Sequence, residues 1–288
     1  MRRRPAWQRR PTGCSRPDAP DRPGERLRPA RTPFSEVVAA LRAAGCVFAE
    51  DEARLLVDAA RTPADLAAMV ERRAAGLPLE HVVGWAEFCG LRIAVDPGVF
   101  VPRRRTEFLA RQAAALVPAD GVAVDLCCGS GAVGAVLAAT ADGADVHAAD
   151  IDPAAVACAR RNLDPARVHE GDLFAALPSA LRGRVDVLVA NVPYVPTEEV
   201  ALLPAEARDH EPRIALDGGP DGLDVARRVI AEAPSWLAPG GHLLFETSER
   251  QLPDALRAAA ARGLRPRAAV DDDLAAAVVI AASRPGRG

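Results

Sequence analysis

The chain has 288 residues; 49% are hydrophobic but only 4% are aromatic, so a sizeable core must be built mostly from alanine, valine and leucine. All 36 basic residues are arginines, and 39 acidic residues bring the net charge to −3. The six cysteines form no C-x-x-C pair and no apolar run is long enough to span a bilayer, which argues against a metal site, a disulfide framework and a membrane protein. We therefore expect a cytoplasmic protein with reduced thiols.

The charge is distributed unevenly along the chain. Residues 1–33 carry ten arginines against three acidic residues, together with seven prolines and almost no large apolar side chains. Such a segment cannot bury enough surface to offset the entropy of ordering, so we predict a disordered extension, with an RNA-touching arm as the alternative. The rest of the chain carries 26 arginines against 36 acidic residues. Because nucleic-acid-binding proteins normally show a basic face, stable nucleic-acid binding is not expected.

Residues 34–76 are predicted to form a small helical domain. Its three short helices are separated by Gly45 and by the pair Thr62-Pro63, and Gly76 ends the third. Threonine is a favoured N-cap, proline fits the first helical position and glycine fits the C-terminal cap. These residues are equally compatible with packing or dimerisation and with docking of a substrate, and we assign the domain to substrate docking.

Residues 77–102 are predicted to form a β-hairpin that links two domains. Residues 81–84 and 91–95 alternate roughly as strands do. Gly90 and the turn at residues 96–98 punctuate them.

Residues 103–288 are predicted to form an α/β domain. Strands are expected at residues 122–126, 144–149, 168–172, 185–190, 242–246 and 277–282, and helices at 106–117, 131–141, 224–237 and 252–262, with another helix starting at Pro153. Such alternation is typical of a doubly wound, mostly parallel sheet that binds ligands at the carboxyl ends of its strands.

A glycine-rich turn follows the first of these strands. The hexapeptide GSGAVG at residues 129–134 matches G-x-G-x-x-G, in which glycines allow a tight turn and close approach of a ligand to the backbone. Asp150, at the end of the next strand, can accept hydrogen bonds from two ribose hydroxyls. Taken alone, these features also fit a nicotinamide-dependent oxidoreductase.

Two further carboxylates favour S-adenosylmethionine as the cofactor. Asp125 lies inside the end of the first strand, where it can help to place the methionine end, whereas a diphosphate would gain nothing from a negative charge there. Asp172, at the end of the third strand, can accept the amino hydrogens of adenine while Leu173 packs on the ring. With Asp150, these residues end three successive strands on one rim of the sheet, which predicts a methyltransferase.

The motif Asn191-Val192-Pro193-Tyr194 follows the fourth strand. The asparagine amide offers one acceptor and two donor hydrogens, and the tyrosine ring offers a flat face. Pro193 fixes its own φ and biases Val192 towards an extended conformation. We expect these four residues to hold a planar –NH₂ group, with Asn191 and the Val192 carbonyl accepting its two hydrogens and Tyr194 covering it.

Several segments in order resemble the HemK-type protein-(glutamine) methyltransferases, which methylate the glutamine side-chain amide of peptide chain release factors. The similar segments lie on both sides of the glycine turn and of the motif at residues 191–194, which we call the acceptor motif. They are residues 76–84, 88, 90–91, 95–103, 106–107, 211–212, 215–216, 218–219 and 221–223. The resemblance covers about residues 34–282. It implies a class I, Rossmann-like fold with a seven-stranded sheet, S-adenosylmethionine as cofactor, S-adenosylhomocysteine as product and a release factor as substrate.

The expected site combines these inferences. Cofactor binding is assigned to Asp125, Cys127, Cys128, Gly129, Ser130, Gly131, Asp150, Ile151, Asp172, Leu173 and Asn191; catalysis to Asn191, Pro193 and Tyr194; and substrate binding to these three with Val192. We expect a monomer that binds no metal.

Two departures from the family pattern concern the substrate. Val192 stands where the family usually has a proline, and Arg104-Arg105 replaces a usual proline-acidic pair. A methyltransferase for the amino group of adenine or guanine in RNA or DNA remains the alternative, because that acceptor is also a planar –NH₂. A non-catalytic cofactor-binding protein is a further alternative.

Overall fold

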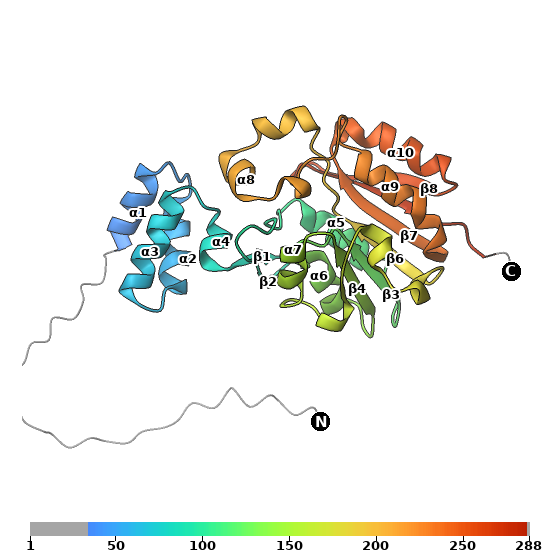
Figure 1. The fold of residues 1–288 in the computed structure, drawn as a ribbon, viewed down its shortest axis with the longest axis horizontal. Coiled ribbons are helices and arrows are strands. Elements are labelled where there is room, and N and C mark those ends of the chain that lie inside the picture. Colours follow the sequence, from blue (N-terminus) through green and yellow to red (C-terminus); the bar gives the residue numbers. More distant parts are fainter. Residues whose placement is uncertain (1–33, 287–288) are drawn as a thin grey trace, which may run out of the picture. The chain divides into compact units, whose positions relative to one another are not determined.

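The computed structural model describes residues 34–286. The predicted disordered extension, residues 1–33, lies outside this part of the chain. The helices and strands are labelled in Figure 1.

Three amphipathic helices open the described chain, as predicted: α1 (Phe34–Ala43), α2 (Ala49–Ala59) and α3 (Pro63–Ala74). Thr62 caps α3, because its hydroxyl accepts a hydrogen bond from Asp65 N at 3.1 Å. Apolar side chains of the three helices form a separate small core, which also contains Val82.

The strand predicted at residues 81–84 is wrong, because this segment belongs to a short helix, α4 (Leu79–Val83). Pro78 precedes the helix, and Gly84 ends it with a left-handed φ of 81°. The buried ring of His81 contacts Val99 O through Nε2 at 2.8 Å. An apolar run this short does not distinguish a strand from a helix by periodicity, and tertiary contacts decide it.

A two-stranded antiparallel hairpin follows, formed by β1 (Trp85–Phe88) and β2 (Leu91–Ala94). The Asn162 side chain ties the hairpin to the glycine turn. Its amide oxygen accepts a hydrogen bond from Ala94 N at 2.9 Å. Its amide nitrogen donates hydrogen bonds to Ala94 O at 2.9 Å and to Ser130 O at 2.8 Å.

The rest of the chain builds the predicted α/β domain around a seven-stranded sheet. Its strands are β3 (Val122–Leu126), β4 (Asp145–Asp150), β5 (Val168–Glu170), β6 (Val185–Ala190), β7 (Leu237–Thr247), β8 (Arg265–Asp271) and β9 (Ala276–Ala282). The spatial order is β5-β4-β3-β6-β7-β9-β8, with β9 antiparallel to its two neighbours and the other pairs parallel. Successive strands are added towards β5 from β3 and towards β7 from β6, so the strand order reverses between the parallel neighbours β3 and β6. This is the switch point where such sheets bind ligands.

Helices cover both faces of the sheet (Figure 1). They are α5 (Thr106–Ala114), α6 (Ala132–Thr140) and α7 (Pro153–Ala159) on one face, and α9 (Asp224–Glu232) and α10 (Leu252–Ala261) on the other. Alternate residues of each strand feed the two cores: Val187 and Val189 of β6 pack towards α5 and α6, whereas Leu188 and Ala190 pack towards α9.

The segment between β6 and α9 is irregular. It contains η4 (Thr197–Leu202), α8 (Ala205–His210) and η5 (Arg213–Ala215), and we call residues 197–216 the wall segment. Further 3₁₀ turns lie at Pro165–Arg167, Leu173–Ala176, Ser179–Leu181, Ala233–Ser235 and Glu249–Gln251.

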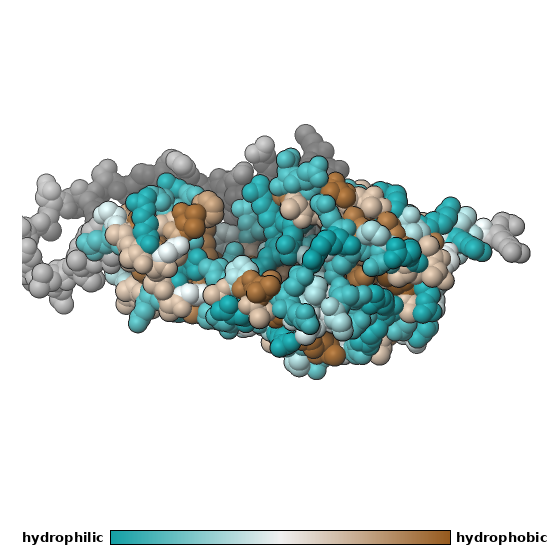
Figure 2. All heavy atoms as spheres, turned by 90° about the horizontal axis from the view of Figure 1, so that it is seen from above, coloured by the Kyte–Doolittle hydropathy of each residue, from teal (hydrophilic) through white to brown (hydrophobic). Residues whose placement is uncertain are grey.

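Within residues 34–286, none of the helices combines the length and apolar character needed to cross a membrane. On the face shown in Figure 2, hydrophobic side chains gather in small separate patches among hydrophilic ones.

Candidate active site

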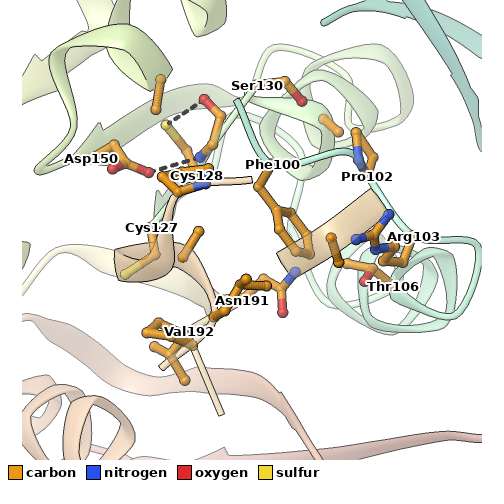
Figure 3. A pocket seen from close by; sticks show the side chains of 18 of the residues that line it. Phe100, Pro102, Arg103, Thr106, Cys127, Cys128, Ser130, Asp150, Asn191 and Val192 are labelled. Carbon is orange, nitrogen blue, oxygen red and sulfur yellow. Dashed lines mark hydrogen bonds between the residues drawn. The ribbon is translucent and has the colours of Figure 1, made fainter. Parts of the chain in front are cut away.

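A cavity of about 500 Å³ lies at the switch point of the sheet. Its floor is formed by the carboxyl ends of β3, β4 and β6. Its sides are formed by the loop that follows the hairpin (residues 95–105), the start of α5 and the wall segment. Figure 3 shows the side chains that face it. The predicted residues that line it are Asp125, Cys127, Cys128, Gly129, Ser130, Asp150, Asn191, Val192, Pro193 and Tyr194.

The glycine turn is held against the end of β4 by Asp150. Its Oδ2 accepts a hydrogen bond from Gly129 N at 2.9 Å (dashed in Figure 3), and its Oδ1 accepts one from Asp152 N at 3.0 Å. Gly129 has a φ of 54°, and a Cβ added there would meet no heavy atom within 4 Å. The backbone therefore borders open space, as a turn that receives a ligand must.

Asp125 lies deeper in the cavity and is only 1% exposed. Its Oδ2 accepts a hydrogen bond from Gly134 N at 2.8 Å, and a Cβ at position 134 would come within 3.3 Å of the same oxygen. Burial raises the pKa of Asp125 to about 7, although the Gly134 bond opposes this shift; the nearby Asp150 adds to it. A carboxylate in this state is poised to pair with a cationic ligand group.

The two cysteines contribute shape to the cavity rather than a nucleophile. Cys127 takes a left-handed φ of 54°, and Cys128 N donates to Ala149 O at 3.1 Å. Burial, reinforced by the carboxylates of Asp150 and Asp125, raises the pKa of both thiols, so they stay protonated.

Four predicted cofactor residues are not among the residues that line the cavity: Gly131, Ile151, Asp172 and Leu173. Gly131 opens α6 with a left-handed φ of 77°, and Ile151 is half exposed. Asp172 forms an ion pair with Arg228 of α9, with Oδ2 and Nη2 2.6 Å apart. Leu173 is buried.

The acceptor motif lies directly after β6, as predicted. Val192 is buried, whereas Asn191 and Tyr194 are partly exposed and face the cavity. The Tyr194 hydroxyl donates to Glu246 Oε1 at 2.8 Å. Burial and the adjacent Glu246 raise the pKa of Tyr194, so its hydroxyl stays protonated and is no base.

Glu246, near the end of β7, is a site residue that was not predicted from the sequence. It is 1% exposed, and its Oε1 also accepts from Arg105 Nε at 3.0 Å. The Arg105 guanidinium lies 5.5 Å from the centre of the Tyr194 ring. The arginine that replaces the usual acidic residue is thereby part of the support of the acceptor motif.

The wall segment is fixed on two sides. Glu211 accepts hydrogen bonds from Val101 N at 3.1 Å and from Arg103 Nη2 at 2.5 Å, and its side chain is fully buried. Glu206 pairs with Arg73 of α3, with 2.7 Å between Oε1 and Nη1. The wall of the cavity therefore depends on contacts with both the loop that follows the hairpin (residues 95–105) and the helical domain.

We expect the Tyr194→Phe variant to lose roughly 1–3 kcal/mol of folding free energy, because Glu246 loses a hydrogen bond in a buried place. Urea denaturation measures this loss. In a Glu246→Gln background the same substitution should cost less, since no buried charge remains; equal costs would contradict the coupling.

No group of three or more potential metal ligands occurs within residues 34–286. The cavity instead offers a left-handed turn that borders open space, the Asp150 carboxylate at the end of β4 and the buried carboxylate of Asp125. This donor set fits S-adenosylmethionine, which carries hydroxyls and a positive charge. Fold and site together define a class I S-adenosylmethionine-dependent methyltransferase.

Comparisons with known proteins narrow this class. Residues 90–206 match the methyltransferase small domain family. The chain is 41% identical to the release factor glutamine methyltransferase of Mycolicibacterium smegmatis over 236 residues, 75% of this chain and 83% of that protein. It is also 41% identical to the enzyme of the same name from Geobacter sulfurreducens over 191 residues, 64% of this chain and 66% of that relative. The chain belongs to the release factor glutamine methyltransferase family.

A solved structure shares the fold. A methyltransferase from Pyrococcus furiosus superposes with a TM-score of 0.53 at 16% identity, covering 76% of this chain and 98% of that one.

Proposed function

We propose that this protein transfers a methyl group from S-adenosylmethionine to the side-chain amide nitrogen of a glutamine in a peptide chain release factor. The observation that carries the proposal is the position of Asn191 and Tyr194 in the same cavity as Asp125 and Asp150. An amide-binding motif and a cofactor-binding rim share one enclosed space. The relatives named above are release factor glutamine methyltransferases, which supports the choice of substrate.

The acceptor end is built to orient an amide. The Asn191 side-chain oxygen accepts one N–H of the substrate and the Val192 carbonyl the other, which directs the nitrogen towards the cofactor end. Tyr194 covers the planar amide while Glu246 and Arg105 hold its ring in place. Orienting reactants in this way can lower a barrier by roughly 7–11 kcal/mol.

The cofactor end is assigned to the rim carboxylates. Asp150 binds the ribose hydroxyls, and Asp125 supports the positively charged methionine end. When bound, S-adenosylmethionine supplies an electrophilic methyl group whose bond to sulfur breaks as a bond to nitrogen forms, with the electron pair staying on sulfur. The acceptor nitrogen loses one proton to water, and the Asn191 oxygen and the Val192 carbonyl accept hydrogen bonds from its two N–H groups until that proton leaves.

The substrate assignment extends to where and how the protein works. Because release factors act in translation, we propose that the protein acts in the cytoplasm. The acidic body of the chain favours a protein substrate over a nucleic acid. We expect the monomer to be the active form.

Tritium transfer from labelled cofactor into a mixture of purified release factor and cellular RNA tests the proposal. We expect the label to appear in the release factor. Label in RNA alone would instead support the amino-group methyltransferase alternative.

The pH dependence of cofactor binding follows from Asp125. Its pKa is raised to about 7 in the free protein, and a bound cation lowers it. We expect affinity for S-adenosylmethionine to be full above that pH and to fall by up to about tenfold per unit below it. Isothermal titration calorimetry at several pH values measures this. The Asp125→Asn variant should bind more weakly with a flatter profile; a profile as steep as that of the wild type would exclude Asp125 as its source.

A further inference from the structure

The hydroxyl of Thr106 is buried at the acceptor end of the cavity without a hydrogen-bond partner in the described part of the chain. The residue is 2% exposed, and its Oγ1 has no partner within residues 34–286. Thr106 nevertheless lines the cavity together with Asn191 and Tyr194. Figure 3 shows Thr106 and Asn191. Because buried polar groups are normally paired, this unpaired hydroxyl calls for an explanation.

Capping of the helix does not explain it. Thr106 is the first residue of α5, one position after the N-cap residue Arg105, and no side chain caps this helix. Here the first backbone groups are already paired, since Thr106 N, Glu107 N and Phe108 N donate to the carbonyls three residues before them. The hydroxyl is therefore free to serve a group that enters the cavity.

An amide in the proposed orientation lacks one partner. Asn191 and Val192 accept its two N–H hydrogens, which leaves its carbonyl oxygen in need of a donor. The cationic donors nearby are already engaged, because Arg103 pairs with Glu211 and Arg105 with Glu246. The Thr106 hydroxyl is a neutral donor in the same cavity.

We propose that Thr106 is a substrate-binding residue whose hydroxyl donates a hydrogen bond to the oxygen of the acceptor amide. This inference rests on the proposed function. A donor at that oxygen stabilises the negative charge that moves onto it as the nitrogen loses its proton, and it thereby favours the deprotonation that accompanies methyl transfer. The acceptor class it selects is a primary carboxamide.

The Thr106→Val variant tests this role because it keeps the shape and removes the hydroxyl. We expect kcat/KM for release factor to fall by roughly ten- to a hundredfold while the Kd for S-adenosylmethionine stays unchanged. We also expect Tm to rise by roughly 2–4 °C, because an unpaired buried hydroxyl destabilises the folded state. Thr106→Ser should restore most of the activity.

A merely structural threonine would behave differently. It would give a lower Tm in Thr106→Val, or an unchanged kcat/KM, and either result would overturn the inference. Thr140→Val is the matched control, since that hydroxyl lies outside this cavity and donates to Val136 O at 2.7 Å. It should lower Tm slightly and leave activity intact.

The inference and the proposed function fail in different ways. If the wild type and Thr106→Val methylate release factor at the same rate, the proposed function holds and the inference about Thr106 is wrong. Wild-type protein that does not methylate release factor removes both.

Discussion

We expect the Asn191→Ala variant to lose methyl transfer by roughly 10²–10³-fold. The substitution removes the side-chain oxygen that orients the acceptor nitrogen, while the carboxylates at the other end of the cavity remain. Affinity for S-adenosylmethionine should therefore stay within a few-fold of the wild type. Initial rates with release factor and calorimetry with the cofactor separate the two effects.

The Asn191→Gln variant is the control for position. It keeps the amide but moves it by one methylene, so it should also be slow if placement matters. Transfer at the wild-type rate by Asn191→Ala would remove Asn191 from the catalytic assignment.

The Asp150→Ala variant should show the opposite pattern, with cofactor affinity reduced by roughly ten- to a hundredfold. The carboxylate accepts hydrogen bonds from Gly129 N and Asp152 N, so its loss also loosens the turn that would receive the ligand. At saturating cofactor the turnover should recover in part, because the acceptor motif is intact. Calorimetry and a cofactor titration of the rate measure both quantities.

Asp164→Ala provides the matched control for Asp150. Asp164 is also an aspartate that accepts a backbone hydrogen bond, from Ala166 N at 3.0 Å, but it lies outside the cavity. Its replacement should leave cofactor affinity unchanged. If Asp150→Ala bound the cofactor as tightly as this control, the ribose assignment would be wrong.

The alternation of strands and helices could be predicted from sequence, because buried parallel strands read as short apolar runs between helices with clear caps. Thr62 and Asp152 are such caps, and both accept the expected backbone hydrogen bonds. β8 was missed because its residues are mostly exposed and include Pro266, which fits only an edge strand. The helix α4 was misassigned because an apolar run of this length does not distinguish a strand from a helix, although Pro78 and Gly84 bound it.

The site was predictable where one strand end carries the whole signal. Asp125, Asp150 and the acceptor motif each follow an apolar run, and all of them line the cavity. Glu246 carries the same signal, because it follows the apolar residues 243–245 and ends the strand predicted at residues 242–246, but no role was assigned to it. Thr106 has no such signal. Glu246 matters because it accepts a hydrogen bond from Tyr194, 52 residues earlier in the chain. Thr106 matters because its buried hydroxyl has no hydrogen-bond partner within residues 34–286.

Asp172 shows the limit of reading one strand end alone. Its position predicts an adenine-binding carboxylate, yet in the folded protein its side chain pairs with Arg228, 56 residues away. The adenine contact therefore stays a prediction.

Peptide mass spectrometry of purified release factor, after incubation with this protein and S-adenosylmethionine, tests the central claim most directly. Our account predicts the gain of one methyl group on the side-chain amide of a glutamine, and no gain with Asn191→Ala. A release factor that stays unmodified, or a methyl group on a different residue type, would contradict it.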